Sequence, residues 1–141
     1  MIQTATGEDV TTVVTHLRAF NASVVGAYAF KPVSLVYRDE DGGVVGGIVG
    51  EVVLGWLRIE MLWVAPGRRK MGVGSALLIA AEQAALELGA GHVHLDTFDW
   101  QAAGFYAKHG YLEFGRLNNY PQGHQRIFMS KTLCGYPTST R

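Results

Sequence analysis

The chain has 141 residues, 48% of them hydrophobic and 17% charged, which is long enough for one globular domain and too apolar for a disordered chain. Its 12 basic and 12 acidic residues balance, so it lacks the basic excess of a general nucleic-acid-binding protein. The single Cys134 permits no internal disulfide, and the first residues, MIQTATGEDV, have no signal-peptide pattern. No apolar run approaches the roughly 18 residues that span a bilayer. We therefore expect a cytoplasmic protein without membrane or nucleic-acid partners.

The N-terminal segment has the pattern of a helix. We expect Thr6 to cap it, because a threonine hydroxyl at this position accepts a backbone N–H and Asp9 favours the first turn. Apolar residues follow at the spacing of one helical face, at Val10, Val13, Val14 and Leu17. The helix is expected to end at Phe20–Asn21, and a second short helix is expected over residues 22–30.

Three strands should follow as an antiparallel meander. Residues 33–38 read as a strand, and residues 39–43 (DEDGG) contain the Asp-Gly pair typical of hairpin turns. The returning strand covers residues 44–54, where interior glycines weaken it or mark bulges. A turn at Gly55 then leads into a third strand over residues 57–64.

The C-terminal half alternates between helices and strands. Residues 75–88 and 100–109 have helical patterns, and each is followed by a glycine that can end a helix. Because a helix connects the third strand to the fourth, these two strands should be parallel. We therefore expect an α/β fold in one domain over residues 1–134, followed by a flexible tail over 135–141. The remaining strands are expected at residues 92–97, 111–116 and 126–131.

The segment RRKMGVGS, residues 68–75, places positive charge and two glycines before a predicted helix. An anion is expected to bind there, because backbone N–H groups converge at a helix N-terminus and glycine lets a ligand approach them. The P-loop pattern G-x-x-x-x-G-K-[ST] fails, since Val73 replaces the lysine. The dinucleotide pattern G-x-G-x-x-G lacks its third glycine, at Leu77. The pattern [QR]-x-x-G-x-[GA] fits Arg69–Gly74, and a plain turn before a helix is the alternative.

Three segments in order carry a family resemblance. Leu62–Pro66, Arg69–Gly74 and Phe105–Tyr111 together resemble the GNAT superfamily of acetyl-CoA-dependent N-acetyltransferases, the last segment being similar to the family's Y-x-x-x-G-F pattern. The resemblance covers residues 33–131. It implies a GNAT-like mixed, mostly antiparallel twisted sheet with flanking helices, and acetyl-CoA as the co-substrate.

The resemblance also implies which residues hold acetyl-CoA. Its pyrophosphate would lie on the helix N-terminus, and its acetyl carbonyl and pantetheine arm along the preceding strand. The family usually has asparagine where this chain has Asp99, so Gln101 is a candidate to supply that hydrogen bond. Residues 95–102 and 120–124 look like one small, mostly uncharacterised bacterial branch of the family. The implied cofactor-binding residues are Leu62, Trp63, Val64, Arg69, Lys70, Met71, Gly72, Val73, Gly74, Ser75, Asp99 and Gln101.

Acetyl transfer to an amine needs a base, because an alkylammonium with a pKa of roughly 10.4 is almost fully protonated at neutral pH, and the departing thiolate benefits from an acid. Tyr106 lies at the family's general-acid tyrosine, with a core aromatic as its alternative role. Glu60 is the first candidate for the base, since family members often use a strand carboxylate there. Asp96 and His94, which share one face of the next strand, are alternatives, as are a water chain or an amine that arrives neutral.

In this family the acceptor lies opposite the cofactor, between the first helices and the last hairpin. Aromatic rings there could hold an apolar or cationic amine, although packing is the alternative role for each residue. The H-x-H pair at His92 and His94 lacks further evident ligands, so no metal is expected. The implied substrate-binding residues are Phe20, Asn21, Tyr28, Tyr120 and His124, with Phe30, Trp56 and Arg126 as further candidates.

The function implied is an acyltransferase that acetylates a primary amine of a small molecule by direct attack. One alternative is acetylation of a protein N-terminus or lysine, because residues 119–124 loosely resemble a loop of ribosomal-protein N-terminal acetyltransferases. A second alternative is a non-catalytic sensor that binds acyl-CoA. A homodimer is compatible with the fold, but no sequence pattern specifies it.

Overall fold

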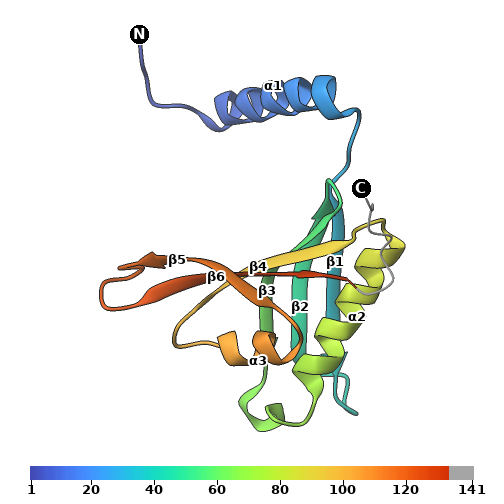
Figure 1. The fold of residues 1–141 in the computed structure, drawn as a ribbon. Helices are drawn as coiled ribbons and strands as arrows, with labels where there is room; N and C mark the ends of the chain where they lie inside the picture. Colours follow the sequence, from blue (N-terminus) through green and yellow to red (C-terminus); the bar gives the residue numbers. More distant parts are fainter. Residues whose placement is uncertain (134–141) are drawn as a thin grey trace, which may run out of the picture.

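The computed structural model describes residues 1–133, so Cys134 and the expected tail over 135–141 lie outside the described residues. One six-stranded sheet has the strand order β1-β2-β3-β4-β6-β5, and only the β3–β4 pair is parallel (Figure 1). This confirms the expected α/β fold with a mixed, mostly antiparallel sheet. The elements follow in the order α1 (Gly7–Val25), β1 (Lys31–Arg38), β2 (Val44–Val53), β3 (Trp56–Val64), the 3-10 turn η1 (Pro66–Arg68), α2 (Val73–Glu87), β4 (His92–Phe98), α3 (Ala103–Lys108), β5 (Leu112–Asn118) and β6 (Gln125–Thr132).

Helix α1 begins as expected and ends later. The Asp9 N–H donates to Thr6 Oγ1 at 3.2 Å and the Thr6 N–H donates to Asp9 Oδ2 at 2.8 Å, which forms a capping box. The predicted end at Phe20–Asn21 and the predicted second helix over residues 22–30 are wrong. One helix runs to Val25, because only Gly26, with a φ of 85°, breaks the backbone pattern.

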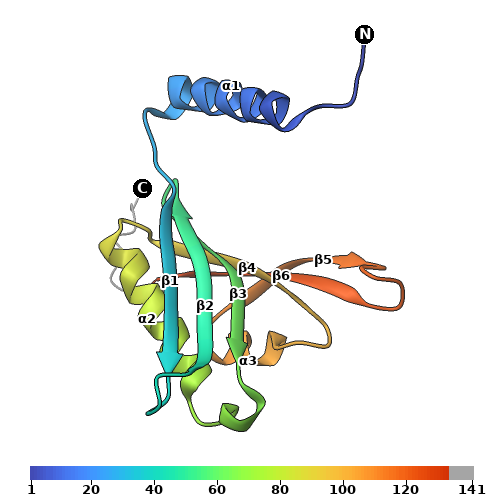
Figure 2. The ribbon, with the colours of Figure 1, turned by 180° about the vertical axis from the view of Figure 1, so that it is seen from behind.

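The core lies between one face of the sheet and α2. Helix α2 buries one face against alternate residues of the strands, through Leu77, Leu78, Ala81 and Ala85. Each large aliphatic side chain that leaves water contributes roughly 1.5–3 kcal/mol. The short α3 lies on the same side of the sheet (Figure 1). In the described chain no helix covers the opposite face, which we call the helix-free face (Figure 2). No helix of residues 1–133 is long and apolar enough to span a membrane.

A nearly buried ion pair ties α2 to the end of the sheet. Lys131 Nζ lies 3.0 Å from Glu82 Oε1, and Tyr111 Oη donates to Glu82 Oε2 at 2.7 Å. The Glu82 side chain is only 12% exposed, so its charge depends on both partners. Removing one member of such a pair leaves the others desolvated and unpaired.

Glu82→Ala is therefore expected to lower the free energy of unfolding by about 2–4 kcal/mol. Urea denaturation at neutral pH measures this change. Glu87→Ala, an exposed glutamate of the same helix, is the control and should shift the unfolding free energy by less than about 0.5 kcal/mol. Equal midpoints for both variants would show that the ion pair adds nothing.

Candidate functional site

Strands β3 and β4 pair along only part of their length. The parallel register joins Trp56–Ile59 to His92–Leu95, whereas β3 continues to Val64 beside β2, and β4 continues to Phe98 beside β6. The two strands therefore separate beyond this register and leave an opening. Along residues 60–64 the β3 edge that faces β4 has no strand partner among the described residues, so its backbone groups are available to a ligand.

A β-bulge lies where the opening begins. Val49 of β2 pairs with Met61 and Gly50 pairs with Ile59, so Glu60 between them has no partner in β2. The bulge reverses the alternation of β3: odd-numbered residues such as Ile59 face the core before it, and even-numbered ones such as Leu62 pack against the core after it. Bulges often re-aim a side chain beside a functional site.

The glycine loop prepares the N-terminus of α2. Gly72 is the N-cap residue, with a left-handed φ of 81° and no capping side chain, so the first-turn N–H groups of Val73, Gly74 and Ser75 remain without a cap. A Cβ atom on Gly72 would project into open space. Arg69 Nε donates to the Val64 carbonyl at 3.1 Å, which fixes the loop to the end of β3. Lys70 and Met71, between Arg69 and Gly72, are exposed. This arrangement can hold an anion on the helix axis.

Helix α3 packs beside this N-terminus. Ser75 Oγ lies 2.9 Å from His109 Nε2, and the Phe105 ring is 3.5 Å from where a Cβ on Gly74 would stand. Gly74 therefore lets α3 approach α2 closely. These contacts fix α3, the helix that carries Tyr106, against the start of α2.

Tyr106 is buried but chemically accessible. Its side chain is 6% exposed, and burial raises the pKa of its hydroxyl to about 12. Its ring packs against Phe105 and Tyr111 at centroid distances of 5.2 and 5.7 Å. Within residues 1–133 no buried polar side-chain atom lacks a hydrogen-bond partner, and the Tyr106 hydroxyl makes no hydrogen bond there, so it must reach solvent.

The end of β4 is fastened by Asp99 and Gln101. Asp99 accepts hydrogen bonds from His124 Nδ1 at 2.8 Å and from the Gln125 N–H at 2.9 Å, and the bond to His124 holds the pKa of Asp99 below its ordinary value. Gln101 Oε1 accepts the Phe98 N–H at 2.9 Å, so the helix expected over residues 100–109 starts only at Ala103. Asp99 is thus engaged by the β5–β6 loop, whereas the Gln101 amide nitrogen makes no hydrogen bond within the described chain.

The three candidate bases differ in their surroundings. Glu60 Oε1 lies 3.4 Å from Arg58 Nη1, with both side chains partly in solvent. Asp96 Oδ1 accepts a hydrogen bond from Arg126 Nε at 2.7 Å. His94 lines a hollow of 360 Å³ on the helix-free face. Burial and the Arg58 guanidinium hold the pKa of His94 below its ordinary value despite the opposing effect of Asp96, so this imidazole stays neutral at pH 7.

The two histidines of the H-x-H pair pack against a tryptophan ring. The Trp56 ring stacks on His92 at 4.7 Å and meets His94 edge-on at 5.7 Å. Among residues 1–133 no three His, Cys, Asp or Glu side chains are grouped so as to hold a metal ion. The two histidines therefore contribute to an aromatic surface.

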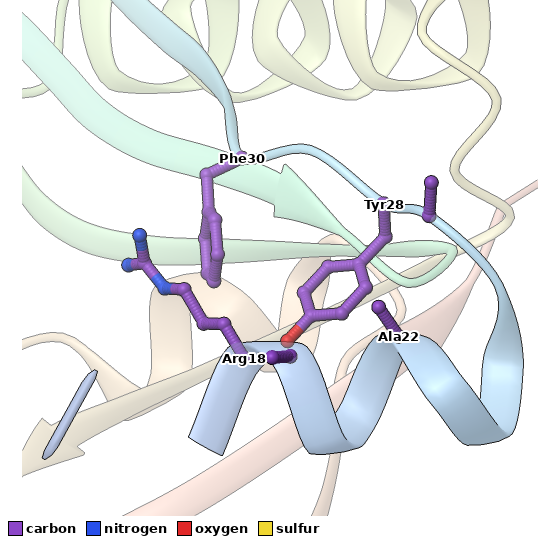
Figure 3. A pocket seen from close by; sticks show the side chains of 6 residues that line it. Arg18, Ala22, Tyr28 and Phe30 are labelled. Carbon is purple, nitrogen blue, oxygen red and sulfur yellow. The ribbon is translucent and has the colours of Figure 1, made fainter. Parts of the chain in front are cut away.

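The structure divides the five expected substrate-binding residues into two groups. Asn21 Nδ2 donates to Tyr28 Oη at 3.2 Å, where α1 meets the linker to β1. The Tyr28 hydroxyl points toward α1 (Figure 3). Phe20 lies on α1 near this point and is exposed. Tyr120 and His124 lie in the β5–β6 hairpin, which extends sideways from the sheet, whereas α1 stands apart above the sheet (Figure 1). Within a single chain, the residues of α1 and its linker are therefore not brought together with those of the β5–β6 hairpin.

Tyr120 and His124 belong to an aromatic cluster that our sequence reasoning missed. Phe98 stacks on Trp100 at 4.5 Å, Tyr120 packs on Phe98 at 5.7 Å, and His124 meets Trp100 edge-on at 4.9 Å. Arg126 Nη1 donates to Tyr120 Oη at 2.7 Å, and its guanidinium lies over the Tyr120 ring. The available signal was FDW at residues 98–100, two rings flanking the turn after β4.

Comparisons with known proteins point to one family. Residues 9–111 match the sequence profile of the acetyltransferase (GNAT) family. The chain is 41% identical over 95 residues to the blasticidin-S acetyltransferase of Streptomyces morookaense. The aligned region covers 67% of this chain and 70% of the relative. The crystal structure of an acetyltransferase from Bacillus cereus ATCC 14579 is 34% identical and superposes with a TM-score of 0.89, covering 94% of this chain and 97% of the other. An aminoglycoside 6'-N-acetyltransferase solved with coenzyme A shares the fold at 21% identity, with a TM-score of 0.67 over 77% of this chain and 76% of its own.

Proposed function

The chain belongs to the GNAT acetyltransferase family, and we propose that it transfers an acetyl group from acetyl-CoA to a primary amine of a small molecule. One observation carries this proposal most directly: the opening between β3 and β4 leads to the uncapped N-terminus of α2, so an unpaired strand edge and an anion site meet. A ligand with a pyrophosphate joined to an extended arm would use both, with the pyrophosphate at the helix N-terminus and the arm along the strand edge.

The residues present fit acetyl-CoA, which supplies the acetyl thioester. The N–H groups of Val73, Gly74 and Ser75 would bind the pyrophosphate, with Arg69 and Lys70 adding positive charge. The extended arm and the acetyl carbonyl would accept hydrogen bonds from the edge of β3 at Leu62, Trp63 and Val64. The free amide nitrogen of Gln101 could bond the arm from the β4 side, while Asp99 holds the β5–β6 loop and Met71 covers the loop.

The chemistry requires two proton transfers. The amine nitrogen forms a bond to the acetyl carbon as its C–S bond breaks, the amine proton passes to a base, and the sulfur takes a proton from Tyr106. Glu60 is our choice for the base, because the bulge presents its carboxylate at the opening and its Arg58 contact is loose. Asp96 is less suited, since Arg126 holds it at 2.7 Å. The Tyr106 hydroxyl can recover its proton from solvent.

The proposed acceptor is a small amine that carries a flat or cationic group. The relative at 41% identity is named for acetylation of blasticidin-S. In this chain the cluster of Phe98, Trp100 and Tyr120 offers aromatic faces at the end of β4, beside the opening. Such faces bind planar rings and cations. A cytoplasmic location stays a prediction, which the single cysteine supports.

Release of the CoA thiol from acetyl-CoA, monitored across a panel of amines, tests this function. The panel contains blasticidin-S, a streptothricin, aminoglycosides, peptides with free N-termini and peptides with internal lysine. We expect turnover on one small-molecule class. Turnover on peptides alone would make the protein a protein acetyltransferase, and acetyl-CoA binding without turnover on any amine would make it an acyl-CoA sensor.

Glu60→Gln is expected to lower kcat/KM for the amine about 100-fold, the scale of general-base catalysis, without changing acetyl-CoA affinity. Steady-state kinetics and calorimetry measure the two quantities. His94→Gln is the matched variant and should keep kcat/KM within a few-fold of wild type. A loss of about 100-fold in His94→Gln, with Glu60→Gln unaffected, would move the role to His94.

A further inference from the structure

Helix α1 carries an apolar face that no other part of residues 1–133 covers. No residue of its 19 is buried, although a helix with one apolar face normally lays that face on a core. In proteins most of a helix's stability comes from packing its apolar face rather than from helix propensity. The exposed face, which we call the α1 stripe, consists of residues between 39% and 70% exposed: Val10, Val13, Val14, Leu17, Phe20 and Val24.

Specific contacts hold α1 away from its own sheet. Asn21 donates to the Tyr28 hydroxyl, the Arg18 guanidinium lies 4.4 Å from the centre of the Phe30 ring, and Tyr28 packs on Phe30 at 5.8 Å (Figure 3). These contacts brace the linker over residues 26–30, and both ribbon views show α1 clear of the strands (Figures 1 and 2).

The helix-free face of the sheet is a matching surface. A hollow of 360 Å³ crosses it, lined by one residue from each of four strands: Trp56, His94, Phe114 and Ser130. Phe114 is 62% exposed, and the neighbouring Leu112 is 75% exposed. Contiguous exposed apolar residues of this kind mark interaction surfaces. The face thus has room for the bulky side chains of a helix.

The exposed area is larger than expected for a compact monomer of this mass. The chain exposes 9755 Å², whereas a compact monomer of 15.3 kDa exposes about 7,100 Å². Even half of this excess would exceed the ~800 Å² that each partner buries in a standard interface. The excess therefore matches the surface that a stable dimer removes from water.

We propose that α1 of one copy packs its stripe on the helix-free face of a second copy, and that the second copy's α1 does the same in return. The occupant is another copy of this chain, because each copy presents both the stripe and the face, and the braced linker directs α1 away from its own sheet. Exchange of identical elements about a two-fold axis closes the assembly. The partner helix then lies over His94, next to Asp96 and the opening. If the proposed function holds, each acceptor site therefore borders both copies.

Light scattering of the full chain in solution tests the exchange independently of acetyl-CoA or activity. Wild type is expected to be a dimer at about 10 μM, a concentration at which standard-size interfaces stay formed. Leu17→Glu, in the centre of the stripe, should shift the protein to monomer. Thr12→Glu, on the opposite face of α1, is the matched control and should remain dimeric. A monomeric wild type, or a dimeric Leu17→Glu, overturns the proposal.

Crosslinking identifies which copy α1 contacts. In a Cys134→Ser background, Leu17→Cys and Phe114→Cys are placed on separate, differently sized chains, which are coexpressed and treated with a short bis-maleimide. The proposal predicts a crosslink between the two chains. A third chain that carries both Leu17→Cys and Phe114→Cys is treated alone in parallel. If this chain crosslinks only within itself and the two separate chains do not crosslink to each other, α1 folds back on its own sheet and the proposal is wrong. Amine turnover is not needed for either readout, so failure of the proposed function would be seen separately.

Discussion

Gly72→Val is expected to weaken acetyl-CoA binding by at least about 100-fold. Gly72 is the N-cap of α2 with a φ of 81°, a conformation that valine resists, and its missing Cβ would project into the open space before the helix N-terminus. The side chain would stand where the pyrophosphate approaches the first-turn N–H groups. Losing two charge-assisted hydrogen bonds of about 1.5–3 kcal/mol each corresponds to 100-fold or more in Kd. Calorimetric titration measures the loss.

Gly55→Val separates lost binding from lost stability. Gly55 has a φ of 83°, and its Cβ would also meet open space, but it lies in the turn between β2 and β3, at the opposite end of β3 from the glycine loop. The same substitution there introduces similar backbone strain. We expect both variants to be destabilised, with only Gly72→Val losing affinity. Wild-type affinity in Gly72→Val would place the pyrophosphate elsewhere.

Tyr106→Phe is expected to lower kcat by about 100- to 1,000-fold while leaving the Kd for acetyl-CoA within about twofold, since a general acid acts on the leaving group and adds little to ground-state binding. Burial raises the pKa of Tyr106 to about 12, so the hydroxyl keeps its proton throughout the neutral range. The wild-type rate should therefore show no loss from tyrosine deprotonation until the pH approaches 12. Steady-state kinetics and calorimetry on one preparation give both quantities.

Tyr111→Phe is the matched control for Tyr106→Phe. Both tyrosines are buried and their rings are 5.7 Å apart, but the Tyr111 hydroxyl is committed to Glu82 at 2.7 Å. Its removal should lower stability and leave kcat within a few-fold of wild type. If the two variants lose activity equally, Tyr106 acts as a packing residue and the acid must be sought elsewhere.

The element order and the glycine loop could be predicted because their signals are local. The Thr6–Asp9 capping box and the Arg69–Gly74 pattern each lie within a few residues. The glycines of β2 were expected to weaken the strand or mark bulges, and Gly50 does lie at the bulge. That the extra residue is Glu60 of β3 could not be predicted, because it is defined by the pairing of β3 with β2. The placement of α1 was equally hidden. Its apolar spacing predicts burial, but it does not say against which surface or in which copy.

The site was predictable in part for the same reason. The candidate residues of the loop and Tyr106 follow from motifs, and their elements α2 and α3 pack together, although their roles remain predictions. The contact of Asp99 with His124 and Gln125 joins positions about 25 residues apart and depends on how β4 meets the last hairpin. Phe98 and Trp100 were missed because their significance appears only when that hairpin brings Tyr120 against them.

Calorimetric titration with acetyl-CoA, in parallel with S-acetylpantetheine, which lacks the pyrophosphate and nucleotide, tests the central claim most directly. The account predicts that acetyl-CoA binds one site per chain and that S-acetylpantetheine binds at least about 100-fold more weakly, because only the former reaches the N–H groups at Val73–Ser75. Equal affinity for the two compounds, or no binding of acetyl-CoA, would contradict the assignment of the glycine loop as the pyrophosphate site.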